Sequence, residues 1–146
     1  MVDMQNPLSL DKQLCFAIYA AGHAFTRFYK PRLDALHLTY PQYLVFLVLW
    51  EQDGPTVKEL GEKLFLDSGT ITPLVKRLEA RGLVMRRRDK DDERQVRVLL
   101  TAEGKALREQ AQAVPLAVMG ATELDGEAMG QLKAELDRLR ERLGAA

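Results

Sequence analysis

The sequence has one cysteine, Cys15, and its tyrosines are the residues best suited to assist that thiol. A thiolate is a nucleophile, and phenol hydroxyls that donate hydrogen bonds to it stabilise the anion. Tyr29 and Tyr40 are the candidates for this role, and Tyr19, one helical turn from Cys15, is a third. The other interpretation is that Cys15 is a small apolar filler in a helix. Because no second cysteine is present, neither an intrachain disulfide nor a cysteine-cluster metal site is expected.

The spacing of Cys15 and Tyr29 limits how they could meet. They stand 14 residues apart, which is about 21 Å along a straight helix and beyond the reach of a phenol. If the two side chains meet, we therefore expect the tyrosine to come from a second subunit.

A second group of polar side chains lies in residues 67–82. Asp67 or Ser68 could cap the start of a helix there, and Gly82 could end it in a left-handed conformation. One stripe of this helix is apolar and the remainder carries hydroxyl and basic side chains. The stripe consists of Ile71, Leu74, Val75 and Leu78. The polar remainder predicts nucleic-acid contacts through Ser68, Gly69, Thr70, Thr72, Lys76 and Arg77.

The segment before this helix predicts a shorter one over residues 57–64. Thr56 and Glu59 have the spacing of a capping box, and Leu60 and Leu64 are expected to face inward. Two short helices joined by a few residues are typical of a helix-turn-helix, in which the second is the recognition helix. Pro73 predicts a kink in that second helix, just beyond its first turn.

Two β-compatible runs, 83–88 and 95–100, flank a polar tip and predict a hairpin, the wing of a winged helix. We expect Leu83 and Met85 on its covered face, together with alternate residues of the second run. Those are Val96, Val98 and Leu100. In the tip, Arg94 follows three acids, and Asp92 among them is expected to support the wing and to fix the direction of the guanidinium. Arg94 could enter a minor groove, and Arg86 is a further candidate DNA contact.

Helical patterns occupy both ends of the chain. From Ser9 to about Leu36 apolar residues recur at helical spacing, with Pro31 expected to bend or divide that helix. Residues 42–52 are so apolar that the whole segment is expected in the core. A helix over 102–114 is expected to end before Pro115 and to continue weakly to residue 120. The last helix opens at residues 124–125 and carries a seam of leucines at 132, 136, 139 and 143.

Composition alone does not select a partner, because the formal net charge is zero. The charges are unevenly placed, however: residues 76–97 contain nine Lys or Arg against five Asp or Glu, so that segment carries +4 and the remainder −4. No apolar run is long enough to span a bilayer, and the first residues lack a signal-peptide pattern. We expect a cytoplasmic protein without a membrane partner.

Several of these motifs together resemble the MarR family of winged-helix repressors. They are the stretch from Asp67 to Glu79, then Gly82–Val84, and then Asp91–Arg94 before Leu100–Thr101. Within that family, three further stretches are similar to the one-cysteine branch of the organic hydroperoxide resistance regulators, OhrR. These are Gln13–Phe16, the spacing from Tyr29 to Leu33, and Leu38–Tyr43. The resemblance covers essentially the whole chain.

The resemblance implies a repressor, not an enzyme, that senses organic hydroperoxides through Cys15. Tyr29 and Tyr40 of one chain would complete the site around Cys15 of the other, and oxidation to a sulfenic acid would re-space the recognition helices and release DNA. Members of the two-cysteine branch carry a resolving cysteine towards the C-terminus, which this chain lacks. The sulfenic acid would then end as a mixed disulfide with a low-molecular-weight thiol, a cyclic sulfenamide or an over-oxidised acid.

We therefore predict a mainly α fold with a small β-hairpin wing, in one MarR-type domain over residues 1–146. Residues 56–100 would form the winged helix-turn-helix that binds DNA, and residues 9–40 and 102–143 would form helical arms of an intertwined homodimer. Such a two-fold dimer would match a pseudo-palindromic operator with half-sites about one DNA turn apart. No cofactor, metal or catalytic residue is expected.

Three other interpretations remain open at this point. The nearest is a MarR-type repressor released by a small aromatic ligand, with Cys15 structural. An enzyme is a second, although His23 and His37 lack metal-ligand spacing and no nucleophile motif is present. A third is a winged helix used only for protein contact, which would have no salt-dependent affinity for DNA.

Overall fold

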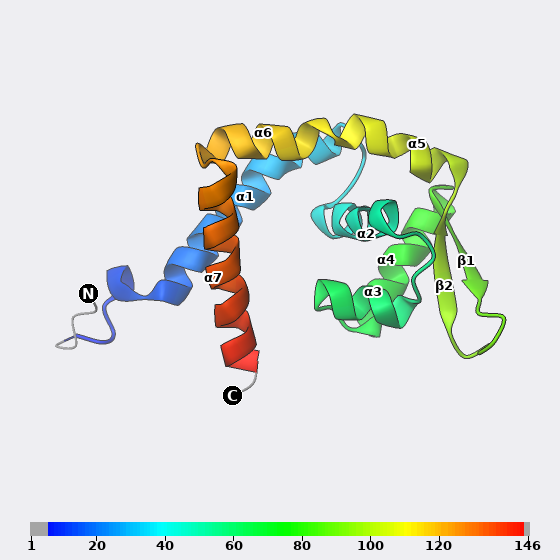
Figure 1. The fold of residues 1–146 in the computed structure, drawn as a ribbon, viewed down its shortest axis with the longest axis horizontal. Coiled ribbons are helices and arrows are strands. Elements are labelled where there is room, and N and C mark those ends of the chain that lie inside the picture. The colour runs from blue at the N-terminus through cyan, green and yellow to red at the C-terminus, as the bar shows by residue number, and fades with distance from the viewer. Residues whose placement is uncertain (1–5, 145–146) are drawn as a thin grey trace. The chain divides into compact units, whose positions relative to one another are not determined.

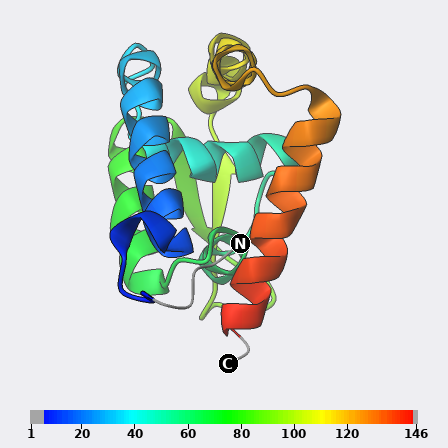
Figure 2. The ribbon, with the colours of Figure 1, turned by 90° about the vertical axis from the view of Figure 1, so that its left-hand side faces the viewer.

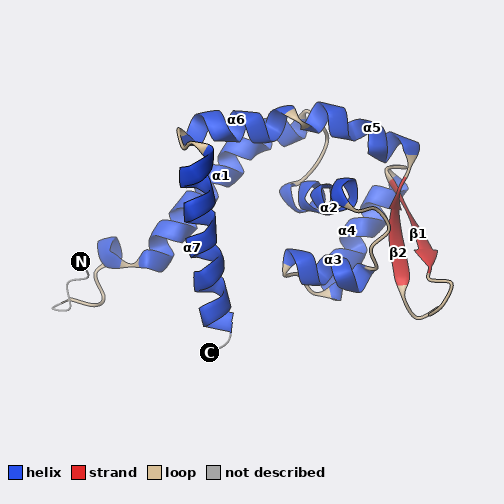
Figure 3. Cartoon of the chain, in the orientation of Figure 1, coloured by secondary structure: helices blue, strands red, loops and turns tan. Residues whose placement is uncertain are grey.

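The computed structural model describes residues 6–144, and the chain divides into two compact units, Met1–Ala111 and Gln112–Ala146. Figure 1 labels the elements and Figure 3 separates helices from strands. The first unit contains a 3-10 turn Leu10–Lys12, α1 Leu14–Asp34, α2 Tyr40–Glu51, α3 Val57–Leu64, α4 Ser68–Ala80, β1 Val84–Arg88, β2 Val96–Leu100 and α5 Ala102–Ala111. The second contains α6 Ala113–Thr122 and α7 Gly126–Gly144. The predicted class, mainly α with one β-hairpin, is confirmed.

Helix α2 forms the centre of the first unit. It packs against α1, α3, α4 and α5, and in Figure 2 it crosses in front of the hairpin. Val45, Phe46 and Leu49 are fully or almost fully buried, and the indole N–H of Trp50 donates to the carbonyl of Gly104 in α5 over 2.9 Å. The expectation that the whole segment is core is wrong at Leu47, which is 42% exposed. A helix surrounded on most sides still has one side that its neighbours do not cover.

Two predictions for the N-terminal helix need correction: the residue at which it begins and the effect of Pro31. Helix α1 begins at Leu14 and not at Ser9, because Gln13 is extended and its side-chain amide donates to the carbonyls of Pro7 and Ser9. Pro31 does not divide α1, which runs on to Asp34. The last turn is held because Leu33 is 1% exposed and packs in the core.

Pro115 does not end a helix, contrary to prediction. It lies in the first turn of α6, directly after α5 has ended at Ala111. Amide groups in a first turn have no intrahelical acceptor, so a proline there costs no hydrogen bond. Pro115, which was predicted to follow the end of a helix, instead lies near the start of α6.

The helix-turn-helix is formed by α3 and α4, and both predicted caps are present. The Thr56 hydroxyl accepts from the Glu59 amide and the Glu59 carboxylate accepts from the Thr56 amide, both over 3.1 Å. The Asp67 carboxylate accepts from the Thr70 amide over 2.8 Å. Leu60 is buried as predicted, whereas Leu64 is half-buried.

The turn between α3 and α4 depends on Gly61. The amide of Leu66 donates to the Gly61 carbonyl over 2.9 Å, which brings the two backbones together. A Cβ at residue 61 would lie 2.5 Å from the carbonyl oxygen of Leu66. Glycine is therefore needed where the turn folds back on α3.

The predicted apolar stripe of α4 is confirmed, since Ile71, Leu74, Val75 and Leu78 are all buried. The helix runs without interruption past Pro73 from Ser68 to Ala80. Gly82 then adopts a left-handed conformation with φ of 75°, as predicted, and the Leu83 amide closes the end by donating to the Leu78 carbonyl.

The covered face of the hairpin was predicted one residue out of register on its first strand. The strands pair antiparallel with Val84 opposite Leu100 and Arg86 opposite Val98. Residues directly opposite share a face, so Val84 joins Val98 and Leu100 in the core. Val84 is 2% exposed and Met85 is 39% exposed, so the expectation for Leu83 and Met85 is wrong.

In the second unit, α7 begins after Asp125, whose carboxylate accepts from the Ala128 amide over 2.7 Å. Three leucines of the predicted seam, Leu132, Leu136 and Leu143, are exposed in the single chain. Within residues 6–144 no helix is both long and apolar enough to cross a membrane.

Candidate nucleic-acid interface and sensor cysteine

The outer face of α4 carries the side chains predicted to contact nucleic acid. Burial of the apolar stripe turns the opposite side outward, so its polar residues are exposed, and only Thr72 is half-buried. The exposed ones are Ser68, Gly69, Thr70, Lys76 and Arg77. The helix thus presents short hydroxyls near its start and cations near its end, a distribution suited to bases and phosphates.

Glu79 ties the last turn of α4 to the wing. Its carboxylate accepts from the backbone amide of Arg86 over 2.9 Å and from the Arg86 guanidinium over 3.0 Å. The backbone hydrogen bond, followed by the guanidinium, lowers the pKa of the Glu79 carboxyl below its ordinary value. Arg86 is therefore half-buried and already paired. Its position favours holding the wing over reaching for DNA.

The wing is also braced to the turn that follows α2. The Arg97 guanidinium donates to the Asp89 carboxylate and to the Gly54 carbonyl, both over 2.8 Å. This pairing lowers the pKa of the Asp89 carboxyl. The Leu100 amide donates to the Asp53 carboxylate over 2.9 Å. The contacts with Gly54 and Asp53 fix β2 to the body of the unit, and the Arg97–Asp89 pair ties β2 to the end of the first strand.

At the tip, the Arg94 side chain is almost fully exposed, at 91%. Asp92 accepts from the Arg94 backbone amide over 3.2 Å and from its guanidinium over 3.1 Å. These contacts are consistent with the support predicted from Asp92, whose role in the wing stays a prediction. The backbone carbonyl of Glu93 accepts from the Arg88 guanidinium over 2.9 Å.

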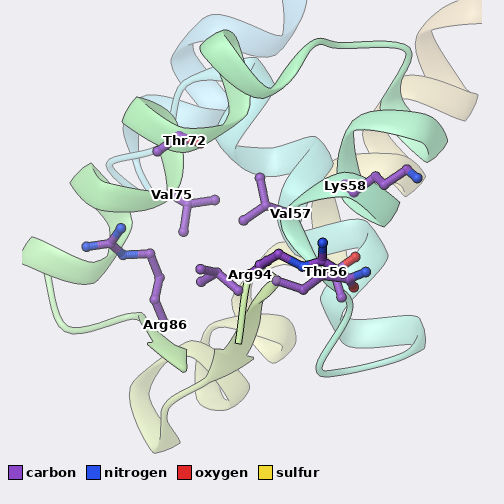
Figure 4. Close-up of a pocket in the computed structure, with 9 residues that line it drawn as sticks. Thr56, Val57, Lys58, Thr72, Val75, Arg86 and Arg94 are labelled. Carbon is purple, nitrogen blue, oxygen red and sulfur yellow. The ribbon is translucent and has the colours of Figure 1, made fainter. Parts of the chain in front are cut away.

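Wing, α3 and α4 enclose a pocket of about 330 Å³. Figure 4 shows side chains from all three elements around it, with Thr72 and Val75 on α4 facing Val57. Arg86 and Arg94 reach this pocket from the wing. The predicted contacts Thr72, Arg86 and Arg94 thus surround one hollow although they are separated in sequence.

A bond at the far end of α4 links it to the loop before α2. The Arg81 guanidinium donates to the carbonyl of His37, a residue with φ of 56°. Two residues later Thr39 caps α2 in a capping box with Gln42. The start of α2, which carries Tyr40, is thereby connected to the recognition helix.

Cys15 and its predicted tyrosine partners occupy different parts of the first unit. Cys15 is exposed in the first turn of α1, and Tyr29 lies on the same unbroken helix. The two residues are therefore about 21 Å apart along it, and one chain does not bring them together. Tyr19 is exposed and its ring lies edge-on to that of His23, with ring centroids 4.3 Å apart.

Tyr29 and Tyr40 do come together within one chain, and Tyr43 joins them. The Tyr29 ring centroid lies 5.0 Å from that of Tyr40 and 5.9 Å from that of Tyr43. Burial, then the neighbouring phenols Tyr40 and Tyr43, raise the pKa of Tyr29 to about 12. Burial also raises the pKa of Tyr40 and of Tyr43. At neutral pH all three phenols therefore keep their protons and are available as hydrogen-bond donors.

A second hollow, of about 510 Å³, runs along α1 beside Tyr40. Its wall is largely apolar and aromatic, with hydroxyl and imidazole groups from Thr26, His23 and the two tyrosines. The lining residues are Ile18, Tyr19, Gly22, His23, Phe25, Thr26 and Tyr40. Cys15 is outside this lining.

Sequence reasoning missed Tyr43, Glu79 and Arg97 as supporting residues. Tyr43 follows Tyr40 by three residues, and that spacing placed the two phenols on one helical face. Arg97 and Asp89 had no comparable signal, because a hairpin pairing register was needed to bring them together. Among the described residues no group of three or more His, Cys, Asp or Glu side chains is positioned to hold a metal ion.

This arrangement of the short helix α3, the recognition helix α4 and a braced hairpin defines a winged helix-turn-helix protein. A family model described as transcriptional regulator SarA/Rot matches residues 27–110. The chain is 55% identical to the HTH-type transcriptional regulator TtmR of Methylorubrum extorquens, over 92% of this chain and 67% of that protein. It is 48% identical to the organic hydroperoxide resistance transcriptional regulator of Bacillus subtilis, over 93% of this chain and 92% of that one.

Solved structures agree with the sequence comparison. Reduced AbfR bound to DNA matches with a TM-score of 0.76 at 37% identity, covering 95% of this chain and 96% of AbfR. Overoxidized AbfR bound to DNA gives the same TM-score and identity; AbfR is a protein of Staphylococcus epidermidis. The chain belongs to the MarR family of winged-helix transcriptional regulators, as its motifs predicted. Because this is a family of regulators, the enzyme interpretation is excluded.

Proposed function

We propose that the protein is a homodimeric, DNA-binding repressor that senses organic hydroperoxides through Cys15 and then releases its operator. The proposal is carried by the presence, in one chain, of an exposed single thiol and, apart from it, a cluster of protonated phenols. Its relatives support the same reading, since one is named for organic hydroperoxide resistance and AbfR has been solved on DNA in reduced and overoxidized forms.

The dimer is part of this proposal because one chain leaves the sensor incomplete. Cys15 and Tyr29 lie about 21 Å apart along α1, so the Tyr29 phenol would reach the thiol only across a subunit boundary. A two-fold dimer would bring Tyr29 and Tyr40 of each chain to Cys15 of its partner, and the same symmetry would place two recognition helices for a pseudo-palindromic operator. The exposed leucines of α7 supply apolar surface for such an interface.

The chemical step is a two-electron oxidation of sulfur. The Cys15 thiolate attacks the outer oxygen of the hydroperoxide, an S–O bond forms, and the O–O bond breaks. The remaining alkoxide takes up a proton and leaves as the alcohol, which leaves a cysteine sulfenic acid. Loss of the thiolate removes the acceptor for the tyrosine hydroxyls, so the contacts that fix the dimer geometry change. With one cysteine in the sequence, a low-molecular-weight thiol, a backbone amide or more oxidant completes the reaction.

The deciding experiment measures operator binding before and after oxidation. An operator duplex selected from a random-sequence pool is bound by reduced protein, and cumene hydroperoxide is then added. We expect release by the wild type and retention by Cys15→Ser, with sulfenic acid trapped only in the wild type. Unchanged binding by the oxidised wild type, or equal release of both proteins, would contradict the sensing role.

A small-molecule ligand is the second candidate function, and the hollow of about 510 Å³ along α1 favours it. Its aromatic lining and hydroxyl groups would suit a phenolic acid. Under this alternative, calorimetry would detect binding of the phenolic acid to wild type and Cys15→Ser alike, and the ligand would release the operator without any oxidant.

A further inference from the structure

A further exposed hollow lies along α3, next to the pocket beneath the wing. It has a volume of about 620 Å³, and its lining runs from that turn to the first residue of α4. The lining residues are Val57, Lys58, Gly61, Glu62, Phe65, Leu66 and Ser68. Val57 and Lys58 line this hollow and also the pocket beneath the wing. Lys58 therefore lies between Ser68 on the recognition helix and Arg94 at the wing tip.

Phe65 is an unexpected residue at this place. Its ring is 66% exposed, and its backbone is left-handed, with φ of 58° and ψ of 39°. A residue with a side chain pays about 1 kcal/mol or more for that conformation, which glycine adopts freely. An aromatic ring that is costly for the backbone and gains little burial in the chain is suited to contact a partner outside it.

We propose that Lys58 and Phe65 form a third contact with the DNA backbone, between the recognition helix and the wing. Lys58 would bind a phosphate, and the Phe65 ring would pack against a neighbouring deoxyribose. The inference rests on the proposed DNA-binding function. DNA is favoured as the partner because Lys58 lies between two predicted DNA contacts, Ser68 and Arg94, so a row of phosphates that reaches from one to the other passes Lys58. In Figure 4 the Lys58 side chain extends outward, away from Val75.

The charges of this surface can be compared within α3. Glu62 lines the same hollow one turn after Lys58 and opposes a phosphate there. Glu59 is nearer to Lys58 in sequence, but its carboxylate is turned back to the Thr56 amide in the capping box. Lys63 is exposed on the same helix yet lines neither hollow. Lys63 is therefore a matched control for Lys58 on the same helix.

The test is the salt dependence of binding to a duplex of about two helical turns, measured for the full-length reduced protein. Loss of one phosphate contact lowers the slope of log K against log salt by about 1. Because the proposed dimer carries two copies of Lys58, we expect Lys58→Gln to lower the slope by about 2, with binding about sixtyfold weaker at 0.1 M salt. Lys58→Arg should restore the slope, Lys63→Gln should leave it unchanged, and Glu62→Gln should strengthen binding.

Phe65→Asn tests the ring separately, because asparagine tolerates the left-handed backbone. We expect weaker binding by the same factor at every salt concentration and an unchanged slope. Wild-type binding by Phe65→Asn would overturn the contact between the ring and the DNA backbone. Wild-type slope in Lys58→Gln overturns the phosphate contact, whereas a wild type without salt-dependent affinity overturns the proposed function itself.

Discussion

The phenol cluster is the part of the molecule in which single residues have the clearest electrostatic consequence. Tyr29, Tyr40 and Tyr43 lie in mutual ring contact and are partly buried. Burial disfavours a phenolate, and each ionised neighbour disfavours the next. The cluster therefore remains a set of neutral donors at any pH at which the protein would work.

Ionisation of Tyr29 should weaken the fold at high pH. An unfolded tyrosine ionises near its ordinary value of 10.0, and the folded pKa is about 12. The unfolded state then holds fewer protons than the folded state, so stability is full below pH 10 and falls as pH rises to 12. Urea unfolding at several pH values should show this loss, and Tyr29→Phe should reduce it. An unchanged pH dependence in Tyr29→Phe would refute the assignment.

Gly61 should tolerate no side chain. In Gly61→Ala the new Cβ would meet the Leu66 carbonyl oxygen at 2.5 Å, and relief of that contact must move the turn before α4. We expect a loss of about 1–3 kcal/mol in the free energy of unfolding, typical of overpacking. Gly130→Ala on α7, where a Cβ meets nothing within 4 Å, is the control and should gain about 0.5–1 kcal/mol. Equal effects of the two changes would argue against the close approach.

At the scale of single elements, the start of the recognition helix depends on its N-cap residue, Asp67. Asp67→Ala removes the acceptor for the Thr70 amide and should lower stability by about 1 kcal/mol. Asp67→Asn keeps an acceptor while removing the same charge, so it should retain most of that stability. Thermal unfolding of both variants distinguishes capping from charge, because a pure charge effect would make them equally stable.

The elements show where sequence was sufficient. The caps at Thr56 and Asp67 and the buried stripe of α4 follow from short-range spacing, and each was predicted correctly. The wing register was not, because Leu83, Val84 and Met85 are all apolar and alternation alone does not choose between them. The pairing of Val84 with Leu100 in the folded hairpin determines that Val84 is the residue that faces the core.

The prolines and the supporting charges show where sequence was not sufficient. Pro73 lies inside α4, as predicted, but Pro31 does not divide α1 and Pro115 lies in the first turn of α6, because neighbouring apolar packing or a place in a first turn outweighs a local breaker signal. The pairing of Arg97 with Asp89 and with the Gly54 carbonyl joins segments that only the folded chain brings together. The roles predicted for Cys15 and for the residues on α4 and the wing remain predictions.

At the scale of the whole molecule, the exposed apolar seam of α7 predicts assembly. A helix that leaves Leu132, Leu136 and Leu143 in solvent gains stability when a second apolar surface covers them. We expect Leu136→Glu to reduce the mass in sedimentation from dimer to monomer and to weaken operator binding at least tenfold, because two half-sites are no longer bound together. Glu135→Gln, on an exposed neighbouring position, should keep the dimer. A dimeric Leu136→Glu would place the interface elsewhere.

The bracing of the hairpin has a consequence for protein engineering. Among the described residues, the hydrogen bonds that anchor the wing to the body arise outside residues 90–94: Arg97 donates to the Gly54 carbonyl, the Leu100 amide to the Asp53 carboxylate and the Val98 amide to the Pro55 carbonyl. The five-residue tip is therefore a graft site. Tips from other winged helices could be exchanged on this frame without redesigning its core, so that groove preference is altered independently of the sensor.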